Sequence, residues 1–158
     1  MAYARHPRVT PPTLAHALAK SNHMLATILP TASVGEAARQ LAALDVGVLA
    51  VVESGALCGT LSHRDIVSYL ARGGSLDHPV ANAMFACTDG AAASDALESW
   101  LQKSGTEARA LAVFDQGRLI GLLEFSDLLA ESEAHHRRVF NEMVMDERVM
   151  FRRGTYSC

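Results

Sequence analysis

Residues 53–67 read ESGALCGTLSHRDIV, and residues 115–129 read DQGRLIGLLEFSDLL. The second stretch repeats the glycines, leucines and acidic residues of the first at a constant spacing. The matching pairs are Glu53 and Asp115, Gly55 and Gly117, Leu57 and Leu119, Gly59 and Gly121, Leu61 and Leu123, and Asp65 and Asp127. Agreement this dense over so short a window indicates that the chain contains an internal repeat.

Each copy of the repeat predicts a β-hairpin. An acid, a spacer and a glycine separate two apolar runs in both copies, at residues 53–55 and 115–117. Glycine accepts the positive φ of a tight hairpin turn. The runs before the turns, residues 48–52 and 111–114, are short and rich in Val, Leu and Ala. This composition is typical of strands that are buried on both faces.

Helices are expected before and after each hairpin. Ser62 with Asp65, and Ser33 with Glu36, follow the capping-box pattern that marks a helix start. Apolar residues recur at helical spacing before both hairpins: Ala37, Ala38, Leu41 and Leu44 in the first copy, and Ala96, Leu97, Trp100 and Leu101 in the second. Residues 26–29 and 86–88 are expected to add a strand ahead of these helices. The predicted unit is strand, helix, strand, hairpin, strand and helix, and it occurs twice in the chain.

The first copy has the order Gly, two residues, Ser, two residues and Asp after an apolar strand and a hairpin, and the second copy repeats this order with Glu124 in the serine position. This pattern resembles the cystathionine-β-synthase (CBS) domain. A tandem pair of these domains is called a Bateman module. Residues 59–67, GTLSHRDIV, resemble the corresponding stretch of small stand-alone proteins with two CBS domains. The resemblance covers residues 25–133. It implies an α/β fold in which two βαββα repeats pack about a pseudo-twofold axis.

This resemblance divides the chain into four parts. They are an N-terminal extension with a short helix at 1–24, CBS repeat 1 at 25–78, CBS repeat 2 at 79–133, and a C-terminal helical extension at 134–158. The last part carries an apolar stripe made of Val139, Phe140, Met143 and Val144. Together with Leu41 and Trp100, this stripe is expected to expose more apolar surface than a small monomer does. We therefore expect a homodimer.

A carboxylate in the first turn of a helix, beside a hydroxyl and exposed backbone amides, suits a nucleotide. The acid can accept both ribose hydroxyls while the amides face phosphate. The resemblance implies that Asp65 holds the ribose, Ser62 the sugar or phosphate, and His63 and Arg64 the phosphate. It further implies that the base is sandwiched by Thr27, Ile28, Gly47 and Val48. The alternative is that Ser62 and Asp65 only cap a helix.

A second, weaker site is expected in the second repeat, with the residues Asp127, Ser126, Glu124 and Arg109. Glu124 stands where the first repeat has Ser62, and its charge would repel a phosphate. We therefore expect unequal sites. A phosphorylated adenosyl ligand binds at the first, and the second is empty, weak, or selective for an uncharged or cationic ligand.

The expected function is that of a regulatory module that senses an adenosyl ligand, namely AMP, ADP, ATP or S-adenosylmethionine, and signals to a partner protein. No cofactor is required. The alternative is a dimeric protein-interaction module with no physiological ligand. The sequence contains no nucleophile elbow, phosphate-binding glycine loop, dinucleotide fingerprint or zinc-protease motif, so we expect no enzyme.

Charge and hydropathy exclude other classes. A net charge of -3 provides no field to attract nucleic acid. No apolar run approaches the ~20 residues that span a bilayer, and the first residues lack a signal core, so we expect a cytoplasmic protein with no membrane partner. The adjacent His135 and His136 would point in different directions on a helix, so no metal site is expected.

Overall fold

The computed structural model describes residues 10–21, 24–88, 90–103 and 110–153, and side chains as far as residue 145. The first half of the chain forms α1 (Leu14–Lys20), β1 (Thr27–Ile28), α2 (Val34–Leu44), β2 (Val48–Glu53), β3 (Ala56–Ser62) and α3 (His63–Ala71). The second half forms η1 (Val80–Asn82), β4 (Phe85–Ala86), β5 (Ala91–Ala92), α4 (Leu97–Lys103), β6 (Ala110–Asp115), β7 (Arg118–Glu124) and α5 (Phe125–Arg153).

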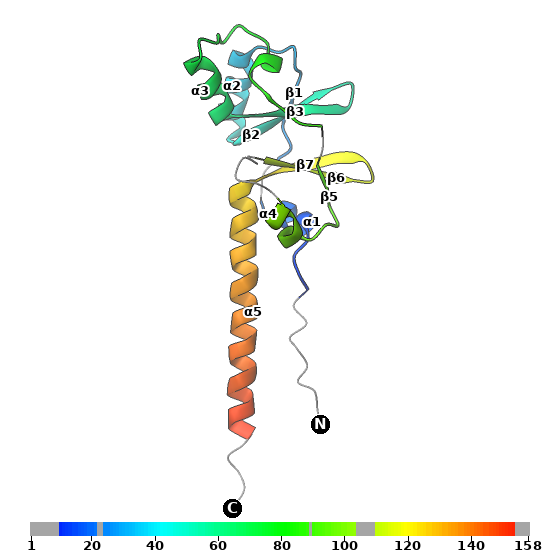
Figure 1. The fold of residues 1–158 in the computed structure, drawn as a ribbon, viewed down its shortest axis with the longest axis vertical. Coiled ribbons are helices and arrows are strands. Elements are labelled where there is room, and N and C mark those ends of the chain that lie inside the picture. Colours follow the sequence, from blue (N-terminus) through cyan, green and yellow to red (C-terminus); the bar gives the residue numbers. More distant parts are fainter. Residues whose placement is uncertain (1–9, 22–23, 89, 104–109, 154–158) are drawn as a thin grey trace, which may run out of the picture.

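Two small sheets lie between helices, which gives the expected α/β fold of two repeats about a pseudo-twofold axis (Figure 1). One sheet has the strand order β1-β2-β3-β4 and the other has the order β5-β6-β7. In each, a short parallel strand pairs with a long strand, which turns back through a hairpin. Both hairpins also contain a register shift at the same place, after Val51 in β2 and after Val113 in β6.

The hairpin turns have the predicted backbone geometry. Ser54 and Gly55 have φ angles of 51° and 79°, and Gln116 and Gly117 have φ angles of 48° and 78°. Two consecutive residues with positive φ produce the turn whose twist matches that of the flanking strands. The glycine in each turn is therefore explained by local backbone geometry.

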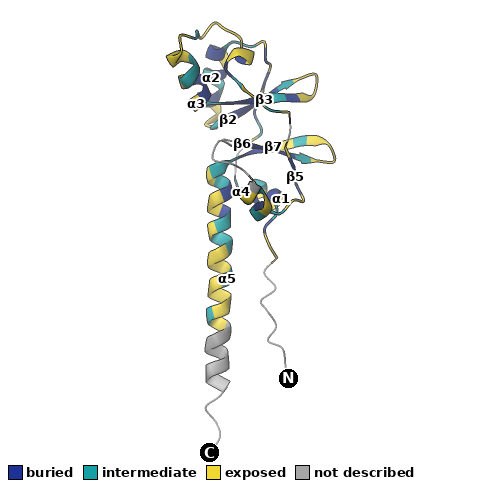
Figure 2. Cartoon of the chain, in the orientation of Figure 1, coloured by how far each residue is buried: buried dark blue, intermediate teal, exposed yellow. Residues whose placement is uncertain are grey.

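The core consists of three clusters of buried residues, which lie in and around the two sheets (Figure 2). Leu41, Leu49 and Leu61 belong to the cluster between the first sheet and its helices. A second cluster lies beneath the other sheet. The third joins the repeats and contains Ala50 and Ala112, which are 0% and 3% exposed. These small side chains allow the two sheets to pack closely.

Each repeat is completed by the segment that precedes the other repeat. Leu14 and Ala17 of α1 lie in the core of the second repeat, and Val80 and Ala83 lie in the core of the first. Backbone hydrogen bonds hold both segments in place; for example, Leu14 N donates to Asp95 O at 3.0 Å. The predicted short N-terminal helix is therefore present, and it packs on the second repeat. The predicted domain boundaries stay a prediction.

The glycines Gly59 and Gly121, which recur in the two copies, make room for these exchanged segments. A Cβ atom on Gly59 would collide with the backbone carbonyl oxygen of Phe85 in β4. A Cβ atom on Gly121 would lie 2.5 Å from the side chain of Leu18 in α1. Glycine is thus needed at the two positions for different reasons: a backbone lies close to Gly59, and a side chain lies close to Gly121.

Two expectations were wrong. Ala86 does not begin a strand of the second repeat: it belongs to β4, which pairs with the edge of β3 that the first hairpin leaves open. The strand of the second repeat is β5, at Ala91 and Ala92.

The expectation that Leu41 contributes to an exposed apolar surface was also wrong. Leu41 is 1% exposed, because the sheet of its own repeat covers the apolar face of α2. Trp100 is half-buried against the second core.

The C-terminal helix α5 extends far beyond the sheets (Figure 1). It has 29 residues, which corresponds to a length of about 43 Å at ~1.5 Å per residue. Leu128, in its first turn, is buried, whereas Phe140, Met143 and Met145 are 64%, 54% and 64% exposed. Within the described residues, no helix is long and apolar enough to cross a membrane.

A buried carboxylate near the start of α5 forms ion pairs with side chains of α1. Glu131 is 7% exposed, and its carboxylate oxygens lie 2.8 Å from Arg138 Nη2, 3.2 Å from Lys20 Nζ and 3.4 Å from His16 Nε2. Burial alone would raise the pKa of the Glu131 carboxyl. Hydrogen bonds and charges from Arg138 and Lys20 outweigh burial and lower this pKa below its ordinary value of 4.5.

We expect Glu131→Gln to lower the free energy of unfolding at neutral pH by about 1–2 kcal/mol, since charge-assisted hydrogen bonds are lost while the half-exposed cations remain screened by water. A lowered native pKa gives stability that is present above the unfolded-state pKa and is lost as pH falls through the native value. Urea denaturation at pH 7 and in acid measures this, and the deficit should shrink in acid. The exposed neighbour Glu133→Gln is the control; an equal loss in both variants would contradict the proposed ion-pair network.

Candidate functional site

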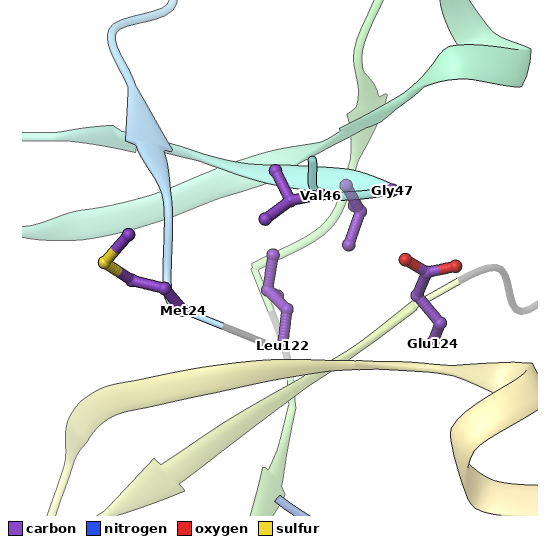
Figure 3. Close-up of a pocket in the computed structure, with 6 residues that line it drawn as sticks. Met24, Val46, Gly47, Leu122 and Glu124 are labelled. Atoms are coloured by element: carbon purple, nitrogen blue, oxygen red, sulfur yellow. The ribbon is translucent and has the colours of Figure 1, made fainter. Parts of the chain in front are cut away.

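A small pocket lies between the two repeats, where the start of β2 faces the end of β7 (Figure 3). Apolar side chains, one glycine and one acid line it: Met24, Val46, Gly47, Val48, Leu122 and Glu124. The free space accommodates about one water molecule. The pocket is therefore a narrow slot in the interface between the repeats.

The Glu124 carboxylate points across the interface to Gly47 (Figure 3). A Cβ atom on Gly47 would overlap Glu124 Oε1, so glycine is what lets the carboxylate approach the backbone of the other repeat. Among the residues that the structure describes, none forms a hydrogen bond or an ion pair with this carboxylate. An acid beside apolar walls loses part of its hydration, which costs free energy unless a partner compensates.

Ser62 and Asp65 form the predicted capping box at the start of α3. Ser62 donates to Asp65 Oδ2 through its backbone N at 2.8 Å and through Oγ at 2.6 Å, and Asp65 N donates to Ser62 Oγ at 3.3 Å. Asp65 is only 6% exposed. A ribose would have to compete with Ser62 for this carboxylate. The cap is confirmed, and the ribose contact stays a prediction.

The second repeat has a related arrangement without the hydroxyl. Glu124 N donates to Asp127 Oδ2 at 3.3 Å, as Ser62 N does to Asp65. Glu124 replaces Ser62 and cannot supply the hydroxyl hydrogen bond. Its carboxylate turns to the first repeat instead. Ser126 is exposed, and Arg109 falls outside the described residues.

The structure brings some of the predicted first-site residues together. Val48 pairs with Ser62 across β2 and β3, and Gly47 precedes Val48 in the pocket wall. Thr27 is exposed, whereas the side chain of Ile28 packs into the first core. His63 and Arg64 are both exposed in the first turn of α3.

Sequence reasoning missed three residues of the pocket and one relationship. Met24, Val46 and Leu122 were not predicted as site residues, and Glu124 was assigned to a second site away from Gly47. Leu122 could have been found, because residues two apart on a strand share a face and Leu122 precedes Glu124 by two. The contact of Glu124 with Gly47 has no local sequence signal, since it depends on how the repeats dock.

The adjacent histidines of α5 lie apart from this cleft. His136 Nε2 is 2.9 Å from Glu98 Oε1 of α4, and the ring centroids of His135 and His136 are 6.0 Å apart. No group of three His, Cys, Asp or Glu side chains in the described part of the chain is arranged to hold a metal ion.

Comparison with known proteins gives a consistent result. Residues 21–72 match the family described as the CBS domain. A CBS-domain-containing protein from Agrobacterium tumefaciens is 26% identical, with a TM-score of 0.69 over 77% of this chain and 99% of that one. A search of curated proteins found no match.

Two further solved structures share the fold and were determined with ligands. A CBS domain pair in complex with 5′-methylthioadenosine and S-adenosyl-L-methionine is 20% identical, with a TM-score of 0.66 over 79% of this chain and 98% of that one. CBSX2 in complex with AMP is 23% identical, with a TM-score of 0.59 over 77% of this chain and 96% of that one.

Proposed function

Since the chain is a CBS-domain protein with two copies of the repeat, we propose that it is a regulatory module that binds an adenosyl ligand in the cleft between the repeats and signals occupancy to a partner protein. The structural neighbours that contain AMP, or 5′-methylthioadenosine and S-adenosyl-L-methionine, support this ligand class. Catalytic activity is not expected, and a cytoplasmic location stays a prediction.

The observation that carries the proposal is the position of the Ser62 and Asp65 capping box. It stands at the end of β3, directly beside Val48, whose neighbour Gly47 lines the pocket between the repeats. The first turn of α3 adds backbone amides and the exposed His63 and Arg64, which suit a phosphate. The residues proposed for the sugar and the phosphate thus lie at the start of α3, next to the strand that begins with Val48 in the pocket wall.

Binding an adenosyl ligand requires the cleft to open. Ligand pockets usually measure about 300 Å³ or more, far above the single water that fits here. Two lining side chains are not fully buried: Met24, which is 66% exposed, and Glu124, which is half-buried. Rotamer changes of such side chains are common on binding.

The alternative function, a dimeric interaction module without a ligand, is favoured by a different observation. The outer part of α5 exposes Phe140, Met143 and Met145 to solvent. Apolar side chains gathered on a projecting helix suit contact with a second copy or with a partner protein. The homodimer therefore stays a prediction, now supported by α5 and no longer by Leu41.

Asp65→Ala should abolish the thermal stabilisation that an adenosyl ligand gives the unmodified protein, because the ribose loses its acceptor. The loss of the cap itself should cost only ~1 kcal/mol. Thermal shift with AMP, ADP, ATP, S-adenosylmethionine and NAD measures this, since a ligand that binds only the native state raises the melting temperature.

Asp95→Ala serves as the matched control. Asp95 Oδ2 accepts from Ala92 N at 3.1 Å, so this variant loses a comparable local hydrogen bond before a helix. It should keep the full ligand response. A full response in Asp65→Ala would eliminate the ribose contact, and no response to any ligand in the unmodified protein would favour the interaction module.

A further inference from the structure

Among the described residues that line the pocket, Glu124 is the only charged one, and the others are apolar apart from Gly47. Val46, Val48 and Leu122 are 6%, 9% and 6% exposed, so these walls are buried. Val48 and Leu122 belong to the cluster that joins the repeats, and Val46 belongs to the core of the first repeat. A half-exposed carboxylate over such walls attracts a positive group more strongly than it would in open water. The pocket therefore has a negative electrostatic character.

Charge distinguishes the ligand groups that this end of the cleft favours once the cleft opens. A sulfonium carries a positive charge, which the Glu124 carboxylate attracts. A phosphate carries the same sign of charge as Glu124 and is repelled.

We propose that Glu124 is the counter-ion for a sulfonium group on an adenosyl ligand, and that it makes this end of the cleft selective for a cationic adenosyl compound over a phosphorylated one. The proposal rests on the adenosyl-binding function above and adds the ligand class. The equivalence with Ser62 already predicted that Glu124 repels a phosphate, and the structure adds that its carboxylate lies across the interface, opposite Gly47.

The test compares S-adenosylmethionine with S-adenosylhomocysteine by titration calorimetry. The two compounds share the adenosine and the amino-acid portion, and they differ only in the methyl group and positive charge on sulfur. The unmodified protein should bind S-adenosylmethionine about tenfold more tightly, the effect of one ion pair in a partly buried site. In Glu124→Gln, which keeps the side-chain size, this preference should disappear.

Glu53→Gln is the matched control, because Glu53 is exposed at the hairpin end of β2 and should leave the preference unchanged. Glu124→Ser, which installs the residue of the first repeat, should also remove the preference and should raise the affinity for ADP about tenfold. This second variant provides an independent measurement if Glu124→Gln fails to fold.

Equal affinity for the two compounds in the unmodified protein would overturn the proposal, as would a preference that survives in Glu124→Gln. If AMP or ADP binds while the sulfonium makes no difference, the counter-ion role fails and the adenosyl-binding function stands. If none of these compounds binds, the adenosyl-binding function fails and the counter-ion role fails with it.

Discussion

Leu14→Ala lowers the free energy of unfolding by about 2–4 kcal/mol, the range expected when a fully buried leucine leaves a cavity. Leu14 is 0% exposed in the core of the second repeat, although it precedes the first repeat in sequence. The loss should therefore appear in the second repeat. Urea denaturation measures the size of the effect, and amide hydrogen exchange in β6 and β7 locates it.

Leu29→Ala is the control, because Leu29 is 57% exposed and the same atoms are removed from a site in contact with water. It should cost less than about 1 kcal/mol. If Leu14→Ala were as mild as Leu29→Ala, or if it increased exchange in the first repeat instead, the docking of α1 on the second repeat would be wrong.

Gly59→Ala should destabilise the protein by about 2–3 kcal/mol, as overpacking against an immobile neighbour does. The added Cβ atom collides with the backbone carbonyl of Phe85, so β4 must move away from β3. Neither Gly59 nor Gly121 has a positive φ. The backbone conformation at both positions therefore accepts alanine, so any loss of stability measures the steric contact of the added Cβ atom. Urea denaturation measures the loss.

Gly121→Ala is the matched variant at the equivalent position of the second repeat. The three atoms nearest to its Cβ atom all belong to the Leu18 side chain, which can change rotamer, so the cost should be about 1 kcal/mol or less. The two glycines should therefore be unequal although the sequence makes them equivalent. Equal costs, or a larger cost for Gly121→Ala, would show that β4 does not hold its place against Gly59.

Much of the candidate site follows from local sequence. Ser62 and Asp65 are three residues apart, and their capping box needs only a helix to begin between them. The hairpin brings Val48 to the end of β3, and the register shift after Val51 places it opposite Ser62 instead of Leu61. The approach of Glu124 to Gly47 could not be predicted in this way, because it depends on the packing of Ala50 and Ala112 between the sheets.

The sequence by itself determined the repeat, the two hairpins and the helix starts. The turns at Gly55 and Gly117 and the cap at Ser62 depend on chemistry within a few residues, which a single stretch of sequence contains in full.

Only the tertiary structure decided in which repeat the short segments before each repeat are buried. Short apolar segments such as residues 85–86 and 91–92 carry no signal that distinguishes one sheet from the other. Ala86 pairs with the open edge of β3 in the first sheet. Leu14 lies in the core of the second repeat, where Leu18 of the same helix packs against Gly121. The placement of these segments depends on contacts between residues that are distant in the sequence, and its free energy comes from the burial and close packing of apolar side chains.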